Sequence, residues 1–419
     1  MLAHATKKMR KVIAAGPDRI TALQIKEAPR AFIKLLAFFS AWAAELGVFP
    51  TNIRLARMKY IPKKEKGEVR GISLEDLVSK LIEQYVAHPI FPAFESAAPL
   101  IAPEQVANRR GISAEMMICI LTMIIEDSKG KPLLLAITDV KGAFPNLWRE
   151  ALWAKLADAH DNVCEVKQLK ALFSSLGTII LEPGFTSKEV KHKIGIHQGA
   201  PRSGDIFGFF NSDIPAELKQ MGAGVSVRGV QTTCLSFLDD ACTPARDHDT
   251  IRKVLQSLAD YGDRWSQEWS HSKFKVLNIN SVGCPKQWKF KDHWLDTVDH
   301  AKILGVIFHA SRGWIPHFAE KLGVAMYVLR ELRQAGFIGG RNPPLKCLTT
   351  VRAMVWAVLD YGRAVANVRG PRHGDIKTKL ERFHFRTLRE VLGVSSKAPK
   401  LGVTGELGEI PDIWRERQR

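Results

Sequence analysis

The sequence predicts an α+β fold in which short apolar strands alternate with longer helices and a helical segment closes the chain. Apolar residues recur at helical spacing in several long stretches, and short apolar runs bounded by turn residues separate these stretches. After Gly313 the pattern is helical throughout. We find no internal repeat and no low-complexity segment, so the sequence does not predict a repetitive architecture.

Composition favours a globular protein with an anionic partner. The 419 residues are enough for two or three compact units, and 46% hydrophobic with 25% charged residues argues against disorder. The 61 Lys and Arg outnumber 43 Asp and Glu, which gives a net charge of +18. Such an excess attracts nucleic acid, although a basic surface with no dedicated partner is the alternative. The charge is uneven: Thr51 to Arg70 forms a cationic arm, and the segment from Arg312 onward is also basic.

The cysteine pattern and hydropathy suggest a compartment. The six cysteines lack C-x-x-C or Cys/His spacing, so we expect free thiols and no zinc site. No signal peptide is evident, and no apolar stretch reaches the roughly 18 to 20 residues that span a bilayer. We expect an intracellular protein, nuclear or cytoplasmic, that is not secreted and has no membrane partner.

The first half of the chain is predicted to place an acid at the end of a buried strand. Helices are expected over Pro29–Leu46, Leu74–His88 and Ser113–Glu126. A turn then precedes the apolar run Leu133–Ile137, which predicts a buried strand that ends near Asp139. The next helix should begin near Trp148.

The second half is predicted to place two more acids in a hairpin. The strand Thr232–Leu238 is interrupted by Asp239-Asp240 and resumes at Ala241, which predicts a hairpin with both acids in its turn. The other elements expected here are strands at Val190–Ile196, Phe274–Ile279 and Ala301–Phe308, and helices at Ser203–Leu218, Ile251–Trp269, His317–Gln334, Leu345–Tyr361 and Ile376–Leu392.

The three acids suggest metal chemistry. Adjacent carboxylates repel each other, and apolar residues flank Asp239-Asp240 on both sides, as in a buried hairpin. With Asp139 they could hold two hard cations roughly 3.5 to 4 Å apart, the arrangement that assists phosphoryl transfer. For an isolated Asp-Asp pair, a solvated surface turn is the usual alternative. Asp139 could instead cap the next helix.

Three collinear motifs resemble the reverse transcriptases of non-LTR (LINE-type) retrotransposons. They are Asp139-Val140-Lys141-Gly142-Ala143-Phe144, Gly195-Ile196-His197-Gln198-Gly199-Ala200 and Phe237-Leu238-Asp239-Asp240. Weaker likenesses precede and follow them: Ile61-Pro62-Lys63, Arg70-Gly71-Ile72-Ser73, Ser272-Lys273-Phe274-Lys275, Ile303-Leu304-Gly305-Val306 and the segment from Leu388 to Gly408. The resemblance implies a right-hand polymerase fold with fingers, an antiparallel-sheet palm and a helical thumb. It also implies an RNA-directed DNA polymerase that takes an RNA template, a DNA or RNA primer and dNTPs.

The resemblance implies a role for each motif residue. Asp139, Asp239, Asp240 and the Val140 backbone carbonyl would hold two Mg²⁺ ions, with Mn²⁺ as an alternative. Lys273 would give a proton to pyrophosphate. The implied dNTP and template residues are Lys63, Arg70, Phe144, Gln198 and Gly199, of which Phe144 is the steric gate that excludes a 2′-hydroxyl.

Ordinary structural roles compete with these assignments. Phe144 could be a core residue, Gly199 a turn glycine and Lys273 a surface lysine, and Lys63 and Arg70 could belong to a solvated loop. The C-terminal helices could form a bundle with a solvated face, and the stripe Ile376, Leu380, Phe383 and Val391 is better explained as the core of that bundle.

The expected domains are an N-terminal helical extension (1–50), fingers (51–130), a palm (131–310) with part of the fingers interleaved, and a helical thumb with the C-terminal segment (311–419). Pro145, Gly71, Leu238 and Ser203-Gly204 depart from the family pattern, and none of them removes a predicted metal ligand. The departures leave a second hypothesis open, a decayed or domesticated copy that binds nucleic acid without catalysis. An RNA-dependent RNA polymerase is disfavoured by Phe144, and the tail resembles LINE-type chains more than group II intron maturases.

Overall fold

The computed structural model describes residues 2–10, 13–62, 67–91, 100–174, 176–338, 342–363 and 374–408. The chain divides into two compact units. The first comprises Met1–Ala114, Leu134–Val276 and Pro285–Asp296, and the second comprises Glu115–Leu133, Leu277–Cys284 and Thr297–Arg419.

The described N-terminal part of the first unit contains several helices, of which the apolar spacing predicts the last two. They are α1 (Leu2–Lys8), α2 (Ala22–Glu27), α3 (Arg30–Leu46) and α4 (Leu77–Ala87). Pro29 lies at the N-cap of α3, and Gly47, with φ of 65°, ends it. The helix predicted over Pro29–Leu46 is therefore confirmed. Gly47 can end it because glycine takes this left-handed conformation without steric cost.

Part of the cationic arm forms a β-hairpin. After the 3₁₀ turn η1 (Thr51–Arg54), β1 (Leu55–Pro62) pairs with β2 (Val69–Glu75) in a four-stranded sheet of order β2-β1-β4-β7, where β4 is Gly177–Ile179 and β7 is Val190–Lys191. The predicted helix Leu74–His88 is wrong at its start, because Leu74 pairs with Arg57 in the sheet. The predicted strand Val190–Ile196 is likewise limited to the two residues of β7.

A six-stranded sheet forms the centre of the first unit. Its order is β10-β11-β3-β12-β14-β13, and β12 and β14 run on into the second unit with their last two residues. The strands are β3 (Leu134–Asp139), β10 (Leu235–Phe237), β11 (Asp240–Ala245), β12 (Lys275–Asn278), β13 (Gln287–Phe290) and β14 (His293–Val298). Leu134, Leu135 and Ala136 are completely buried, which is why this run forms a central strand.

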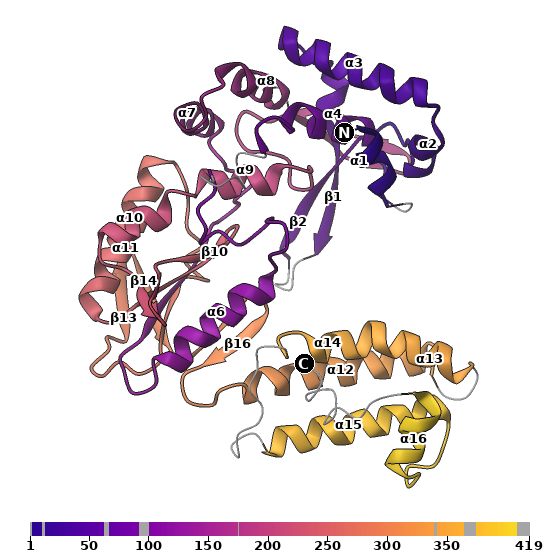
Figure 1. The fold of residues 1–419 in the computed structure, drawn as a ribbon, viewed down its shortest axis with the longest axis vertical. Helices are drawn as coiled ribbons and strands as arrows, with labels where there is room; N and C mark the ends of the chain where they lie inside the picture. The colour runs from indigo at the N-terminus through magenta and orange to yellow at the C-terminus, as the bar shows by residue number, and fades with distance from the viewer. Residues whose placement is uncertain are drawn as a thin grey trace. The chain divides into compact units, whose positions relative to one another are not determined.

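The first unit also contains helices that follow β3 along the chain (Figure 1). They are α7 (Arg149–Ala159), α8 (Val163–Phe173), α9 (Ser203–Phe210), α10 (Ile214–Gln220) and α11 (His248–Arg264). The start of α7 is as predicted. The expected helix Ser203–Leu218 is instead two helices separated at Asn211–Asp213, and the expected helix Ile251–Trp269 starts and ends earlier. Two small hairpins, β5 (Leu181–Glu182) with β6 (Phe185–Thr186) and β8 (Val225–Val227) with β9 (Val230–Thr232), complete the unit.

The second unit is mainly helical, as the pattern after Gly313 predicts (Figure 1). It contains α6 (Ala114–Asp127), β15 (His300–Ile303), β16 (Val306–His309), α12 (Ile315–Gln334), α13 (Pro344–Val351), the π-helical turn η2 (Arg352–Trp356), α14 (Ala357–Asp360), α15 (Gly374–Leu392) and α16 (Lys400–Leu407). The predicted strand Ala301–Phe308 is a hairpin that turns at Leu304-Gly305. The core joins α12, α13, α15 and α16 and includes Leu329, Val351, Phe383, Val391 and Leu407.

The cysteines and the apolar character of the helices complete the description of the fold. All six cysteines are free thiols. In the described part of the chain, none of the helices combines the length and apolar character that crossing a membrane requires.

Candidate active site

Two neighbouring strands bring the three predicted acids together. Strands β3 and β11 pair antiparallel, and this register sets Asp139 directly opposite Asp240. The strand of Asp139 is fixed by burial, since apolar side chains fill both of its faces. Asp139 and Asp240, 101 positions apart, therefore meet because one ends β3 and the other begins β11.

The hairpin turn lies one residue earlier than predicted. Phe237 pairs with Asp240 across β10 and β11, so the two turn residues are Leu238 and Asp239, and Asp240 is the first residue of β11. The predicted turn Asp239-Asp240 is therefore wrong by one position. Asp240 is thus a strand residue, and the separate register between β11 and β3 sets it opposite Asp139.

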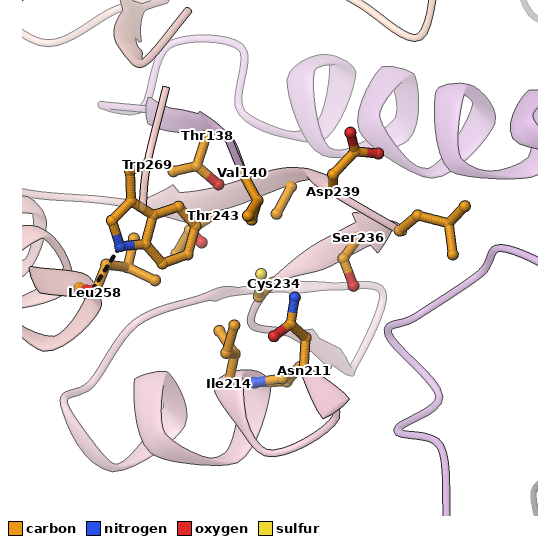
Figure 2. A pocket seen from close by; sticks show the side chains of 13 residues that line it. Thr138, Val140, Asn211, Ile214, Cys234, Ser236, Asp239, Thr243, Leu258 and Trp269 are labelled. Atoms are coloured by element: carbon orange, nitrogen blue, oxygen red, sulfur yellow. Dashed lines mark hydrogen bonds between the residues drawn. The ribbon is translucent and has the colours of Figure 1, made fainter. Parts of the chain in front are cut away.

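The turn is tied to the strand of the first acid. The Val140 amide donates to the carbonyl of Asp239 over 3.3 Å. Figure 2 shows the turn above a small cavity that Thr138, Val140, Asn211, Ile214 and Cys234 help to line. In this view the carboxylate of Asp239 points away from the cavity.

A lysine compensates part of the negative charge. Lys273 Nζ lies 3.0 Å from both carboxylate oxygens of Asp139, from a turn that precedes β12. Burial lowers the pKa of Lys273, but the hydrogen bond to Asp139 and the charges of all three acids outweigh it, so the net pKa is raised. Lys273 is therefore protonated at neutral pH.

The other two acids have raised pKa values. Burial raises the pKa of Asp240 to about 7, and the charges of Asp239 and Asp139 add to this effect. Burial also raises the pKa of Asp239, with a further contribution from Asp139 that the charges of Lys273 and Arg70 oppose. A cation bound between these carboxylates would remove the repulsion.

The donor chemistry suits a hard divalent cation. Three carboxylates at the ends of neighbouring strands offer only oxygen ligands, which Mg²⁺ and Mn²⁺ prefer. Among the described residues, no three His, Cys, Asp or Glu side chains already stand together as a metal-binding group. The acids fit such an ion by the chemistry of their oxygen donors, and Lys273 also forms an ion pair with Asp139.

A cleft of about 710 Å³ adjoins these acids. Its lining comes from β1 and β2, the loop after β3, the segment Ile194–Gln198 and the turn Ser270–Lys273, and it includes Arg70, Asp139, Val140, Phe144, Gln198, Asp239 and Lys273. Lys63 lies outside the described residues. Of the other predicted site residues, Asp240 and Gly199 adjoin lining residues.

The Phe144 ring is half-buried and held by an aromatic contact. Its centroid lies 5.6 Å from that of Phe207 on α9, with the rings tilted by 43°. The ring thus belongs to the core on one side and to the cleft on the other. The core explanation for this residue and the gate explanation are compatible.

The segment Gly195–Gly199 passes between the Phe144 loop and β2. Ile196 donates to the carbonyl of Phe144 over 2.8 Å, and Ser73 on β2 donates to that of Gln198 over 2.8 Å. Gly199 has φ of 119°, and a Cβ there would lie 2.7 Å from the carbonyl oxygen of Ser73. Glycine is therefore required by both backbone angle and space.

Sequence reasoning missed a buried ionic cluster behind this segment. His197 Nδ1 lies 2.7 Å from Glu75 Oε1, and both side chains are buried. Glu83 accepts a hydrogen bond from the backbone amide of Arg202 over 2.9 Å. Burial, then the charge of Glu75, raises the pKa of Glu83 well above its usual value. Glu83 lies within the predicted helix Leu74–His88, and no local sequence pattern indicated that its side chain is buried.

The segment that contains these site residues matches a known protein family. Residues 61–308, more than half of the chain, match the family described as "Reverse transcriptase (RNA-dependent DNA polymerase)". No curated protein matches the chain.

Solved structures similar to the chain include two fungal telomerases. The apo telomerase from Candida tropicalis truncated from its C-terminal domain shares 14% identity with a TM-score of 0.42, and the match covers 66% of this chain and 59% of that one. The telomerase from Candida albicans in complex with a fragment of telomeric RNA shares 12% identity with a TM-score of 0.41, over 93% of this chain and 68% of that one. The chain thus spans about three fifths of the length of the first of these structures.

Proposed function

Because the chain belongs to the reverse transcriptase (RNA-dependent DNA polymerase) family and has its right-hand polymerase fold, we propose that it is an active RNA-directed DNA polymerase. It joins a dNTP to the 3′-hydroxyl of a primer paired with an RNA template. The observation that carries this proposal is the register that sets Asp139 opposite Asp240, with Asp239 in the adjoining turn beside a large cleft.

The acids provide the catalytic charge. Asp139, Asp239 and Asp240, with the Val140 carbonyl, would hold two Mg²⁺ ions, or Mn²⁺ in their place. When bound, such ions stabilise the charge on the attacking and leaving oxygens of the phosphoryl transfer. Lys273, protonated beside Asp139, can supply a proton to the departing pyrophosphate.

The cleft residues position and select the nucleotide. Arg70 on β2 binds the triphosphate with its planar guanidinium, assisted by Lys63. Phe144, held against Phe207, lies under the sugar and excludes a 2′-hydroxyl. Gln198 and Gly199 approach the template base pair with their backbone, which β2 supports through Ser73.

We assign the remaining parts of the chain on the same basis. Residues 1–50 form an N-terminal extension, 51–130 the fingers, 131–310 the palm and 311–419 the thumb with the C-terminal segment. The helices of the second unit would grip the duplex through phosphate contacts. The order of the motifs from Asp139 to Gly408 supports a non-LTR retrotransposon as the source.

Primer extension on an RNA template tests the proposal. We expect Mg²⁺-dependent DNA synthesis by the wild type and a loss on the order of a hundredfold or more in Asp239→Ala. Asp249→Ala, at an exposed acid on α11, is the matched control and should retain activity. A folded wild type that binds primer-template but makes no product with either Mg²⁺ or Mn²⁺ would favour the decayed nucleic-acid-binding copy.

A further inference from the structure

A short segment far from the motifs runs alongside the hairpin that carries Asp239. The Val106 amide donates to the carbonyl of Ser236, and the Ser236 amide donates to that of Glu104, both over 2.9 Å. Gln105 thereby forms a parallel bridge with Ser236 on β10. This segment covers the outer edge of β10, which ends the six-stranded sheet.

The side chain of Gln105 binds the peptide groups of the turn. It is 2% exposed, and its Oε1 accepts a hydrogen bond from the Leu238 amide over 2.9 Å. Its Nε2 donates to the Leu238 carbonyl over 3.5 Å. A side-chain amide carries both a donor and an acceptor, so it can satisfy one residue's N–H and C=O as a neighbouring strand would.

Leu238 has a backbone conformation that needs such support. Its φ is 58°, in the left-handed region that L-residues other than Asn and Asp rarely occupy. In a two-residue hairpin turn a positive φ at the first position is normally supplied by glycine. Leucine also gives no side-chain hydrogen bond of its own to hold the turn.

The stem of Gln105 is itself fixed. A Cβ added to Gly208 on α9 would lie 3.4 Å from Gln105 Cγ, so the helix backbone passes close to this side chain. Oε1 also accepts from the Ala107 amide over 3.3 Å. The amide is therefore presented to Leu238 in one orientation.

We propose that Gln105 is a positioning residue for the metal-binding turn: by holding Leu238 in its left-handed conformation, it sets the direction of the Asp239 carboxylate. The inference rests on the proposed function for its catalytic consequence. The hydrogen bonds between Gln105 and Leu238 do not depend on that function. Gln105 touches no reacting group and acts only through the backbone of the turn.

The test compares Gln105→Met, which keeps the length but removes both hydrogen bonds, with Gln231→Met at an exposed glutamine on β9. In the metal-free protein, we expect hydrogen exchange in peptides spanning residues 234–243 to be about tenfold faster in Gln105→Met only, because the Leu238 amide loses its acceptor. Manganese binding, followed by electron paramagnetic resonance, should weaken by about tenfold. The KM for dNTP at saturating metal should change less than twofold.

A second substitution separates positioning from general packing. Glycine adopts a positive φ without steric cost, so Leu238→Gly in the Gln105→Met background should recover most of the lost manganese affinity. A polar group that merely seals the core would show no such recovery. Should Gln105→Met fail to fold, Gln105→Asn, whose amide is too short to reach Leu238, carries the same expectations.

The outcomes distinguish this inference from the proposed function. Unchanged exchange and unchanged manganese affinity in a folded Gln105→Met variant overturn the inference, whether or not the wild type extends primers. Recovery that is absent in the double variant also overturns it. A wild type without polymerase activity rejects the proposed function, while the exchange experiment still decides the role of Gln105.

Discussion

Lys273 Nζ is equidistant from the two carboxylate oxygens of Asp139, at 3.0 Å from each. This ammonium group pairs with Asp139, and its charge also acts on Asp239 and Asp240. The side chain of Lys273 is more than half exposed, so it can leave Asp139 without disturbing the core.

Lys273→Met should therefore make the stability of the protein depend more strongly on divalent ions than in the wild type. Removing the cation leaves the repulsion between the acids unopposed, although exposure of the lysine limits the effect to about 1–3 °C in Tm. Mg²⁺ should raise Tm more in this variant than in the wild type, as measured by differential scanning fluorimetry. Lys289→Met, at an exposed lysine on β13, is the control. An equal Mg²⁺ shift in both variants would contradict the prediction.

Phe144→Val should relax the choice of sugar. The ring lies half-buried at the cleft wall against Phe207, and a smaller side chain leaves room for a 2′-hydroxyl. We expect the ratio of kcat/KM for dNTP to that for rNTP to fall on the order of tenfold to a hundredfold, the usual range for a steric contact of this size.

Single-nucleotide incorporation with matched dNTP and rNTP measures this ratio. Phe185→Val, at an exposed phenylalanine on β6, should leave it unchanged. Discrimination that survives in Phe144→Val with normal dNTP kinetics would return Phe144 to the role of a core residue.

Glu83 should make stability depend on pH. Burial and the charge of Glu75 raise its pKa in the folded protein above the usual 4.5, so the folded state binds a proton more tightly than the unfolded state. Its contribution to stability is complete below pH 4.5 and is lost as the pH rises through the folded pKa. Glu83→Gln, which mimics the protonated carboxyl and can accept from the Arg202 amide, lacks this loss.

Urea unfolding at several pH values measures the effect. The free energy of unfolding of the wild type minus that of Glu83→Gln should fall steadily from pH 5 to pH 9. Glu189→Gln, at an exposed glutamate, should give a difference that does not vary with pH. A wild-type minus Glu83→Gln difference that rises with pH has the wrong sign and would show that Glu83 is ionised in the folded protein.

The sequence allowed the strand of Asp139 to be predicted because burial on both faces leaves a continuous apolar run, here Leu133–Ile137. It could not give the register of the hairpin. Alternation with a period of two fits a turn at Asp239-Asp240 as well as one at Leu238-Asp239, and the second arrangement is held by Gln105, 133 residues away. A side chain that acts at such a distance leaves no local pattern.

Tertiary pairing also overrode local helix propensity at the end of β2. Leu74 and Glu75 fit a helix with the residues after them, yet they lie in β2 opposite Arg57 and Ala56. The burial of Glu75 against His197 follows from this strand, so predicting a helix concealed the ionic cluster. The three motifs of the site were identified by their resemblance to a known family, whereas Glu75, Glu83 and Gln105 lie in segments without a recognisable motif.

Gly199 offers a direct test of how the segment Gly195–Gly199 is held. At φ of 119° an alanine is strained, and its Cβ would lie 2.7 Å from the carbonyl oxygen of Ser73, a backbone atom that cannot give way without moving β2. Gly199→Ala should therefore displace the Gln198 carbonyl from the Ser73 amide and, with β2, shift Arg70 at the cleft. We expect the KM for dNTP in primer extension to rise by about tenfold or more, since one backbone hydrogen bond and the placement of a triphosphate ligand change together. Gly222→Ala has a similar conformational strain, with φ of 78°, but open space around the added Cβ, so it separates strain from collision. If both variants lose stability equally and neither changes the KM for dNTP, the contact between Gly199 and Ser73 does not position the substrate cleft.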